Sequence, residues 1–124
     1  MCTILLSINP EHVENILNGK KEYEFRKTLC KKKVDRILIY STNPIMKIVG
    51  EAKVEDILVD NPRTIWKITN EKSGINKQYF DQYYKDRERA VAYKLCDIVQ
   101  YSNPKNLQDF GLKNAPQSFL YVES

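Results

Sequence analysis

The stretch of sequence that decides the fold is Gly19-Lys20-Lys21-Glu22-Tyr23-Glu24-Phe25-Arg26. It follows a short segment with apolar residues at helical spacing, and Gly19 is the residue type that most often ends a helix. After the glycine the side chains alternate. Tyr23 and Phe25 point to one side, and Glu24 and Arg26 point to the other. The stretch therefore predicts a helix, a sharp reversal at Gly19, and a strand with one charged face.

Outside this stretch the chain predicts several more strands and a few helices. The strands are expected at 3–8, 21–27, 34–41, 46–58, 90–100 and 117–122. Helices are expected to open at Asn9, Asn61 and Asn76, because asparagine caps a first turn well, and a last helical turn at Asn103-Pro104. Strands outnumber helices without alternating strictly with them, which excludes a doubly wound sheet. The pattern predicts an α+β fold, a small mixed β-barrel of about six strands with flanking helices, and a bulge or bend at Gly50.

Length and composition favour one domain spanning residues 1–124. The chain is 42% hydrophobic and 29% charged, which is typical of a globular protein. No apolar run approaches the ~20 residues of a membrane span, and the first residues resemble a strand rather than a signal peptide. Three widely spaced cysteines argue against a disulfide framework. We therefore expect a cytoplasmic protein without membrane contact, and a monomer rather than an oligomer.

Positive charge is concentrated in one segment. Residues 20–36 hold eight basic residues against three acidic ones, a net charge of +5 in a chain whose total is +4. A basic arm on a nearly neutral body is typical of proteins that contact phosphates. A solvated, lysine-rich hairpin is the alternative interpretation.

Several kinds of site are excluded by what the sequence lacks. The four glycines are isolated from one another, so no phosphate-binding glycine loop is present. The only histidine, His12, falls in the first turn of a predicted helix, where an exposed or packed role is expected rather than catalysis. No cluster of metal ligands is visible. We expect neither a metal nor a cofactor.

The charged face of the predicted strand carries the chemistry. Glu24 and Arg26 are two residues apart on one face, so the guanidinium can hold the carboxylate ionised and oriented. Such a carboxylate accepts hydrogen bonds from the amino group of a base, as it does from cytosine N4. Lys21 offers a cation for a phosphate. Strict alternation places Lys21 opposite Glu24, so the two meet only if the strand bulges or twists after Gly19.

The motif Gly-x-Lys-x-x-Glu-x-Arg at residues 19–26 resembles that of the ASCH family, a branch of the PUA-like superfamily. The segments Leu6-Ser7-Ile8-Asn9-Pro10 and Pro116-Gln117-Ser118-Phe119-Leu120-Tyr121 are similar to the first and last strands of small stand-alone ASCH proteins. The resemblance covers essentially the whole chain. It implies a PUA-like β-barrel.

The resemblance also implies a function related to RNA or nucleotides. PUA-like domains are mostly RNA binders, and ASCH members have been linked to RNA processing and transcription coactivation. One enzymatic type deacylates N4-acylcytidine with a lysine, a threonine and a glutamate, for which the matching residues here are Lys21, Glu24 and Glu71. The glutamate at the threonine position argues against that reaction. Members described as ribonucleases would place Lys21, Ser118 and Tyr40 in the cleft.

The leading prediction is an RNA- or nucleotide-binding ASCH domain, a regulator of RNA or transcription, with a ligand cleft lined by Lys21, Glu24 and Arg26. A metal-independent hydrolase, acting on a modified nucleoside or as a small ribonuclease, is the alternative, and a pure interaction module is a third. The residues expected to contact nucleic acid are Lys20, Lys21, Glu24, Arg26, Lys31, Lys32, Lys33, Tyr40 and Ser118.

Overall fold

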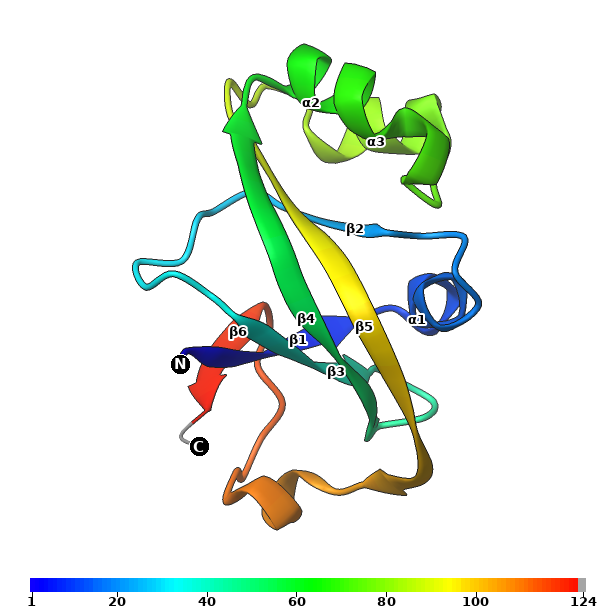
Figure 1. The fold of residues 1–124 in the computed structure, drawn as a ribbon, viewed down its shortest axis with the longest axis vertical. Helices are drawn as coiled ribbons and strands as arrows, with labels where there is room; N and C mark the ends of the chain where they lie inside the picture. The colour runs from blue at the N-terminus through cyan, green and yellow to red at the C-terminus, as the bar shows by residue number, and fades with distance from the viewer. Residues whose placement is uncertain (123–124) are drawn as a thin grey trace.

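A six-stranded mixed sheet frames the molecule, and the computed structural model describes residues 1–122. The strands are β1 (Thr3–Ile8), β2 (Tyr23–Arg26), β3 (Arg36–Ser41), β4 (Lys47–Asp60), β5 (Ala90–Lys105) and β6 (Phe119–Val122). They lie in the order β2-β5-β4-β3-β1-β6. β1 is parallel to β3, and every other neighbouring pair is antiparallel. The sheet curls into a half-barrel (Figure 1), which confirms the predicted mixed α+β architecture.

Three helices flank the sheet: α1 (Pro10–Leu17), α2 (Pro62–Thr69) and α3 (Lys77–Tyr83). Each begins after an asparagine whose side chain accepts a hydrogen bond from a main-chain N–H of the first turn, as predicted for Asn9, Asn61 and Asn76. Short 3₁₀ turns occupy η1 (Asn70–Lys72) and η2 (Leu107–Phe110). No helix within residues 1–122 is long and apolar enough to cross a membrane.

The last helical turn begins later than the sequence predicted. β5 continues to Lys105 instead of ending at residue 100, so Asn103-Pro104 does not open a helix. Proline is tolerated there because the end of a strand does not need its missing N–H donor. η2 is capped by Asn106, which exchanges hydrogen bonds with the main chain and side chain of Asp109. Gly111 ends it in the left-handed conformation, at φ 73°.

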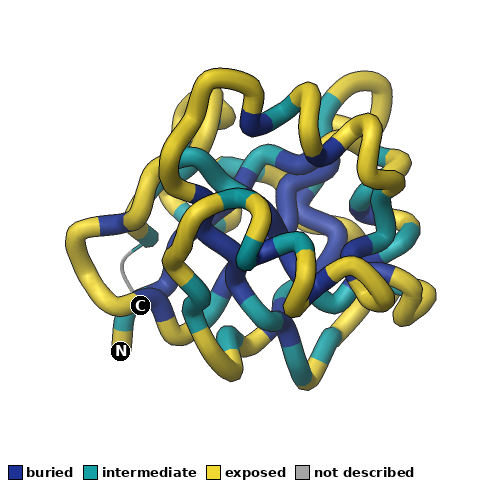
Figure 2. Tube along the Cα trace, turned by 90° about the horizontal axis from the view of Figure 1, so that it is seen from above, coloured by how far each residue is buried: buried dark blue, intermediate teal, exposed yellow. Residues whose placement is uncertain are grey.

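The helices are placed by the core that they complete. Val13 and Ile16 of α1 pack into the main buried cluster with residues of β1, β3 and β5. A second cluster joins α2 and α3 to β2 and β5 through Ile65, Phe80 and Phe25. Figure 2 shows the buried parts of the chain in the centre, with exposed loops around them. α1 and α3 therefore rest on different parts of the sheet, on either side of β2.

Gly50 allows the two longest strands to bend. Its Cα lies so close to the Val99 carbonyl that a Cβ at this position would collide with main-chain oxygen. The β4–β5 register shifts nearby, between Ile48 and Gly50. The predicted bulge at Gly50 is confirmed, and β4 and β5 show two further shifts in their pairing. Irregularities of this kind increase local twist and bending, which is consistent with the curl of the sheet.

Candidate functional site

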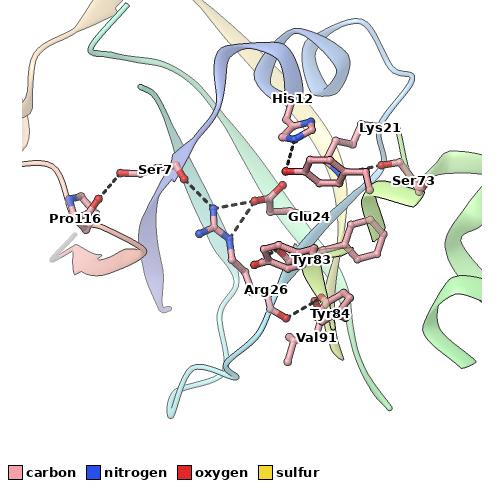
Figure 3. A network of polar contacts seen from close by, with 12 residues as sticks. Ser7, His12, Lys21, Glu24, Arg26, Ser73, Tyr83, Tyr84, Val91 and Pro116 are labelled. Carbon is pink, nitrogen blue, oxygen red and sulfur yellow. Dashed lines mark hydrogen bonds and ion pairs between the residues drawn. The ribbon is translucent and has the colours of Figure 1, made fainter. Parts of the chain in front are cut away.

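Lys21, Glu24 and Arg26 line a single small pocket between α1, β2 and α3. Its volume is about 160 Å³, and we call it the inner pocket. Figure 3 shows several of the lining side chains, among them His12, Lys21, Glu24, Arg26 and Tyr83, together with residues that hold them in place. Besides the three charged residues, the lining includes Ser7, Asn9, His12, Phe25, Ile75, Tyr79 and Tyr83.

Glu24 and Arg26 form a desolvated ion pair on one face of β2. One terminal nitrogen of the Arg26 guanidinium lies 2.8 Å from Glu24 Oε2, and Arg26 Nε donates to the same oxygen at 3.1 Å. The terminal nitrogen also donates to the Ser7 carbonyl at 2.9 Å, which ties β2 to the end of β1. The side chain of Glu24 is only 8% exposed. Among residues 1–122 nothing donates to its other oxygen, Oε1, so this oxygen is available to a ligand.

Lys21 is a buried cation, with 3% of its surface exposed. Its Nζ donates to the Ser73 carbonyl at 2.8 Å and lies 4.7 Å from the centre of the Phe25 ring. Burial lowers the pKa of Lys21. The negative charge of Glu24 raises this pKa, but by less than burial lowers it. The positive charge of Arg26 lowers the pKa further. Lys21 is thus held beside the ion pair in a form that releases a proton more readily than a surface lysine does.

Lys21 reaches the same pocket as Glu24 without the bulge that strict alternation required. β2 begins only at Tyr23, so Lys21 precedes the strand and is not bound by its alternation. Its main-chain N–H donates to the Asn15 carbonyl of α1 at 2.9 Å. Gly74 then lies directly on its side chain, at φ 71°, where a Cβ would collide with the lysine stem. Contacts from α1 and the 73–74 loop therefore fix Lys21.

His12 also lines the inner pocket, which its position in the sequence did not predict. Its Nε2 lies 3.2 Å from the Tyr79 hydroxyl, and the two rings meet edge to face with centroids 5.3 Å apart. Nδ1 is buried, and no residue within 1–122 bonds it. Burial lowers the pKa of His12, and the charge of Lys21 lowers it further. The imidazole is therefore neutral over most of the physiological pH range.

The tyrosines of α3 divide between the core and the pocket. Of Tyr79, Tyr83 and the C-cap residue Tyr84, only Tyr84 is buried. Tyr83 borders the pocket, donates to the Phe25 carbonyl at 3.3 Å and carries the Lys27 ammonium 4.6 Å from its ring centre. Tyr79 is 48% exposed. Two aromatic side chains thus present part of their surface at the pocket mouth.

A second, larger hollow of about 480 Å³ adjoins the inner pocket, and we call it the outer hollow. The two share His12, Ile75 and Tyr79 as a common wall. Lys20 and Glu71 line the outer hollow, not the inner pocket. The residues that would serve a deacylase are therefore divided, with Lys21 and Glu24 inside and an exposed Glu71 outside.

The lysines at 31–33 lie apart from both spaces. They belong to the β2–β3 connection, residues 27–35, which we call the basic loop. This loop borders its own hollow of about 440 Å³, where Glu55 and Asp56 face the lysines. Lys32 Nζ lies 5.0 Å from the centre of the Tyr121 ring. The structure therefore separates the lysines of the basic loop from the Glu24–Arg26 ion pair.

Two further expected contact residues, Tyr40 and Ser118, do not line the inner pocket. Tyr40 is 3% exposed and packs in a buried cluster with Leu5 and Ile48. Ser118 is exposed, and its main-chain carbonyl accepts from Ser7 N–H at 3.2 Å. The segment at 116–118 therefore borders the pocket wall through its main chain. Tyr79 and Tyr83 are the tyrosines that the fold brings to Lys21.

The sequence contains weak signals for the pocket residues that were not predicted, His12, Tyr79 and Tyr83. His12 is the only histidine, and it precedes the charged motif by less than three helical turns. Tyr79 and Tyr83 are four residues apart, which places them on one helix face. Spacing does not reveal which neighbour that face meets, and this requires the packing of α3 beside α1 and β2.

The inner pocket is suited to hydrogen bonding and charge pairing. It offers a carboxylate oxygen as acceptor, one buried and one partly buried cation, a neutral imidazole and two tyrosines. Ligand pockets for whole small molecules usually have volumes of about 300–1,000 Å³. A space of about 160 Å³ admits only part of a nucleotide, such as its base. No group of three or more His, Cys, Asp or Glu side chains within residues 1–122 is placed to hold a metal ion.

Comparison with known proteins identifies a matching family model, a similar protein and a similar solved structure. A family model described as a domain of unknown function, DUF365, matches residues 1–112. The ASCH domain-containing ribonuclease of Zymomonas mobilis is 31% identical in an alignment of 123 residues, and the match covers 95% of this chain and 82% of that protein. The crystal structure of ASCH from Zymomonas mobilis matches with a TM-score of 0.88 at 28% identity, covering 98% of this chain and 87% of the other.

Two longer proteins of Ureaplasma parvum serovar 3 contain a similar stretch. Large ribosomal subunit protein uL22 is 31% identical over 122 residues, and ATP synthase subunit alpha is 30% identical over 123 residues. Each match covers 98% of this chain. The chain spans 39% of the first protein and 15% of the second.

Proposed function

Because this chain belongs to the ASCH family, within the PUA-like fold, and to the DUF365 family, we propose that it binds single-stranded RNA and holds one base in the inner pocket. The observation that carries this proposal is the half-occupied carboxylate of Glu24. Arg26 takes Oε2 and fixes the carboxylate plane, while Oε1 is left to accept from the amino group of a base. The name of the Zymomonas relative, a ribonuclease, favours RNA over other ligands.

The surroundings of Glu24 suit a base in a nucleic acid strand. Lys21 and Arg26 outnumber the single carboxylate, so the inner pocket is positive and attracts the phosphate of the same nucleotide. Tyr83 and Tyr79 offer aromatic surface at the mouth, and aromatic side chains stack on unpaired bases of RNA. Contacts of the basic loop with phosphates would add affinity without sequence preference.

Binding to a fluorescein-labelled single-stranded RNA of mixed sequence tests the proposal. Glu24→Gln keeps the side-chain shape, replaces an acceptor by a donor and leaves Arg26 without its anion. It should cost about 1–3 kcal/mol of binding free energy, or about 5- to 150-fold in Kd. Glu88→Gln makes the same chemical change at an exposed residue far along the chain and should leave Kd unchanged. A folded Glu24→Gln variant that binds like wild type would refute the proposal, and DNA of the same sequence tests the preference for RNA.

Metal-independent RNA cleavage is a second candidate, favoured by the relative named a ribonuclease and by the lowered pKa of Lys21. In such a reaction the 2′-hydroxyl oxygen bonds to the adjacent phosphorus while the bond from phosphorus to the 5′-oxygen breaks. Glu24 is positioned to accept the 2′-hydroxyl proton, Lys21 to give a proton to the 5′-oxygen, and Arg26 to offset the charge on phosphorus.

Analysis of the RNA after incubation distinguishes cleavage from binding without cleavage. A cleaving protein gives fragments ending in a 2′,3′-cyclic phosphate, and Lys21→Met should lower the rate by about 10²-fold or more, the range of general acid catalysis. Lys72→Met, at a lysine that is 60% exposed, serves as the charge control. If the protein binds the RNA and the RNA is still intact after incubation, cleavage is refuted and only the proposed binding function remains.

A further inference from the structure

The common wall between the inner pocket and the outer hollow is the feature that points beyond a single bound base. His12, Ile75 and Tyr79 line both spaces, so an occupant of one lies against the same residues as an occupant of the other. The consecutive lysines divide between them, with Lys21 in the inner pocket and Lys20 in the outer hollow. A whole nucleotide is larger than the inner pocket, whose volume is about 160 Å³. The part of the nucleotide that does not fit must therefore extend toward this wall.

We propose that the outer hollow binds the nucleotide adjacent to the one in the inner pocket, so that the ligand is a stretch of at least two linked nucleotides rather than a free nucleoside. This inference rests on the proposed function of the inner pocket. It identifies the outer hollow as a second subsite and assigns its wall residue Tyr79 to the neighbouring base.

Tyr79 has the properties of a stacking platform. It is half-exposed, and the bond to His12 Nε2 and the edge-to-face contact with the same ring hold its orientation. An aromatic ring that is already fixed loses little side-chain freedom when a base stacks on it. Stacking is also tolerant of base identity, because every base has a π-face.

The polar lining of the outer hollow suits a base and its sugar better than a phosphate. Glu11 and Glu71 outnumber the one cation, Lys20, so a phosphate deep in this hollow would be repelled. Carboxylates accept from base amino groups and ribose hydroxyls. Asn76 uses its side-chain oxygen to cap α3, and no partner within residues 1–122 takes its amide N–H groups. The phosphate that links the two nucleotides is then left at the boundary, within reach of Lys20 and the positive inner pocket.

Comparison of one nucleotide with two linked ones tests this inference. The probes are cytidine 3′- and 5′-monophosphate and the dinucleotide cytidylyl-cytidine with a 2′-O-methyl group that prevents cleavage. The measured quantity is the ratio of mononucleotide Kd to dinucleotide Kd, by calorimetry. One stacked base predicts a wild-type ratio of at least about 5. Tyr79→Ala should bring this ratio close to 1, whereas Tyr79→Phe, which keeps the ring, should retain most of it.

Lys20→Ala tests the expected contact of Lys20 with the linking phosphate, and it has a matched control. It should lower the ratio about two- to threefold, the modest effect of an exposed charge. Lys77→Ala removes an exposed positive charge from α3, outside both hollows, and should leave the ratio unchanged. Both lysines are exposed, so the variants are expected to fold.

The outcomes separate this inference from the function on which it rests. A wild-type ratio near 1 with measurable mononucleotide binding would overturn the second subsite and leave the inner pocket as proposed. A high ratio that survives Tyr79→Ala would also overturn it, because the gain would then come from elsewhere. Failure of both probes to bind would refute the proposed function itself, and the second subsite with it.

Discussion

The inner pocket and the basic loop differ in how the fold treats their charges. In the pocket, Lys21 and Glu24 are withdrawn from water, and each is held by a named partner. In the loop, Lys31, Lys32 and Lys33 remain exposed, with acidic residues of β4 opposite them. Fixed, desolvated groups discriminate between ligands, whereas mobile exposed lysines attract any polyanion. Local charge in a sequence therefore does not by itself locate a specific site.

The largest effect expected from breaking the pocket is on stability. Arg26→Ala leaves the Glu24 carboxylate buried without its counter-ion and removes the link to the Ser7 carbonyl. Loss of one member of a buried pair costs about 3–5 kcal/mol, and the 14% exposure of the Arg26 side chain favours the lower end. Urea unfolding measures this cost. Lys77→Ala, which breaks an exposed pair with Asp81, should cost under about 0.5 kcal/mol. Equal costs for the two would show that the pocket pair is not desolvated.

Neutralising the lysines of the basic loop should weaken binding of a long RNA without changing binding in the inner pocket. Single-stranded binding with about four to five phosphate contacts gives a log–log salt slope near −3, and each lost contact flattens it by about 0.7. Replacing the lysines at 31–33 together by alanine should flatten the slope by up to about 2 and weaken binding of a long RNA about tenfold at low salt. The dinucleotide, which reaches only the pocket region, should bind unchanged.

A triple variant with the same charge loss controls for net charge. Lys67, Lys77 and Lys85 are exposed and lie outside the described hollows. Their replacement by alanine should alter the slope less than the loop variant does. A loop variant with the wild-type slope would show that RNA does not follow the basic loop.

Much of the frame of the molecule was predictable because its signals are local. Asparagine caps, the reversal at Gly19 and the bend at Gly50 depend on neighbouring residues and on main-chain geometry, and the structure confirms them. The predicted start of the last helical turn was wrong, because Asn103-Pro104 carries the same sequence signal as Asn61-Pro62. Only the pairing of β5 with β4 decides between strand and helix at this position.

The pocket was predictable only in part, because its walls come from distant segments. Glu24 and Arg26 are paired as their spacing indicated. The position of Lys21 depends on Ser73 and Gly74, about fifty residues later, and the role of His12 depends on Tyr79. No periodicity encodes such contacts. Sequence spacing found the groups that share a strand face and could not find those that α1 and α3 bring to it.

The burial of Lys21 predicts a pH-dependent term in stability. Its pKa in the folded protein is lowered from the ordinary value of 10.5, mainly by burial. Between the lowered pKa and 10.5 the unfolded chain binds more protons than the folded one, so this lysine makes stability rise with pH in that window. The unfolding free energy of wild type minus that of Lys21→Met should therefore increase from neutral pH toward pH 10, by at most about 1.4 kcal/mol per pH unit. The same difference taken with Lys72→Met controls for the loss of one surface charge, and a flat difference for Lys21 would contradict its burial as a cation.

The smallest effect expected is that of removing divalent metal ions. The one carboxylate in the inner pocket is bound by Arg26, and Lys21 lies beside it, so a divalent cation would meet two positive charges before it reached an oxygen ligand. Magnesium and calcium need several oxygen ligands arranged around them. An excess of EDTA, added at constant ionic strength, should therefore leave both the melting temperature and the Kd for the labelled RNA unchanged. A Kd that rises with EDTA and recovers with magnesium would show that the ion pair opens to admit a metal. The binding chemistry would then have to be reassigned from Arg26 to that ion.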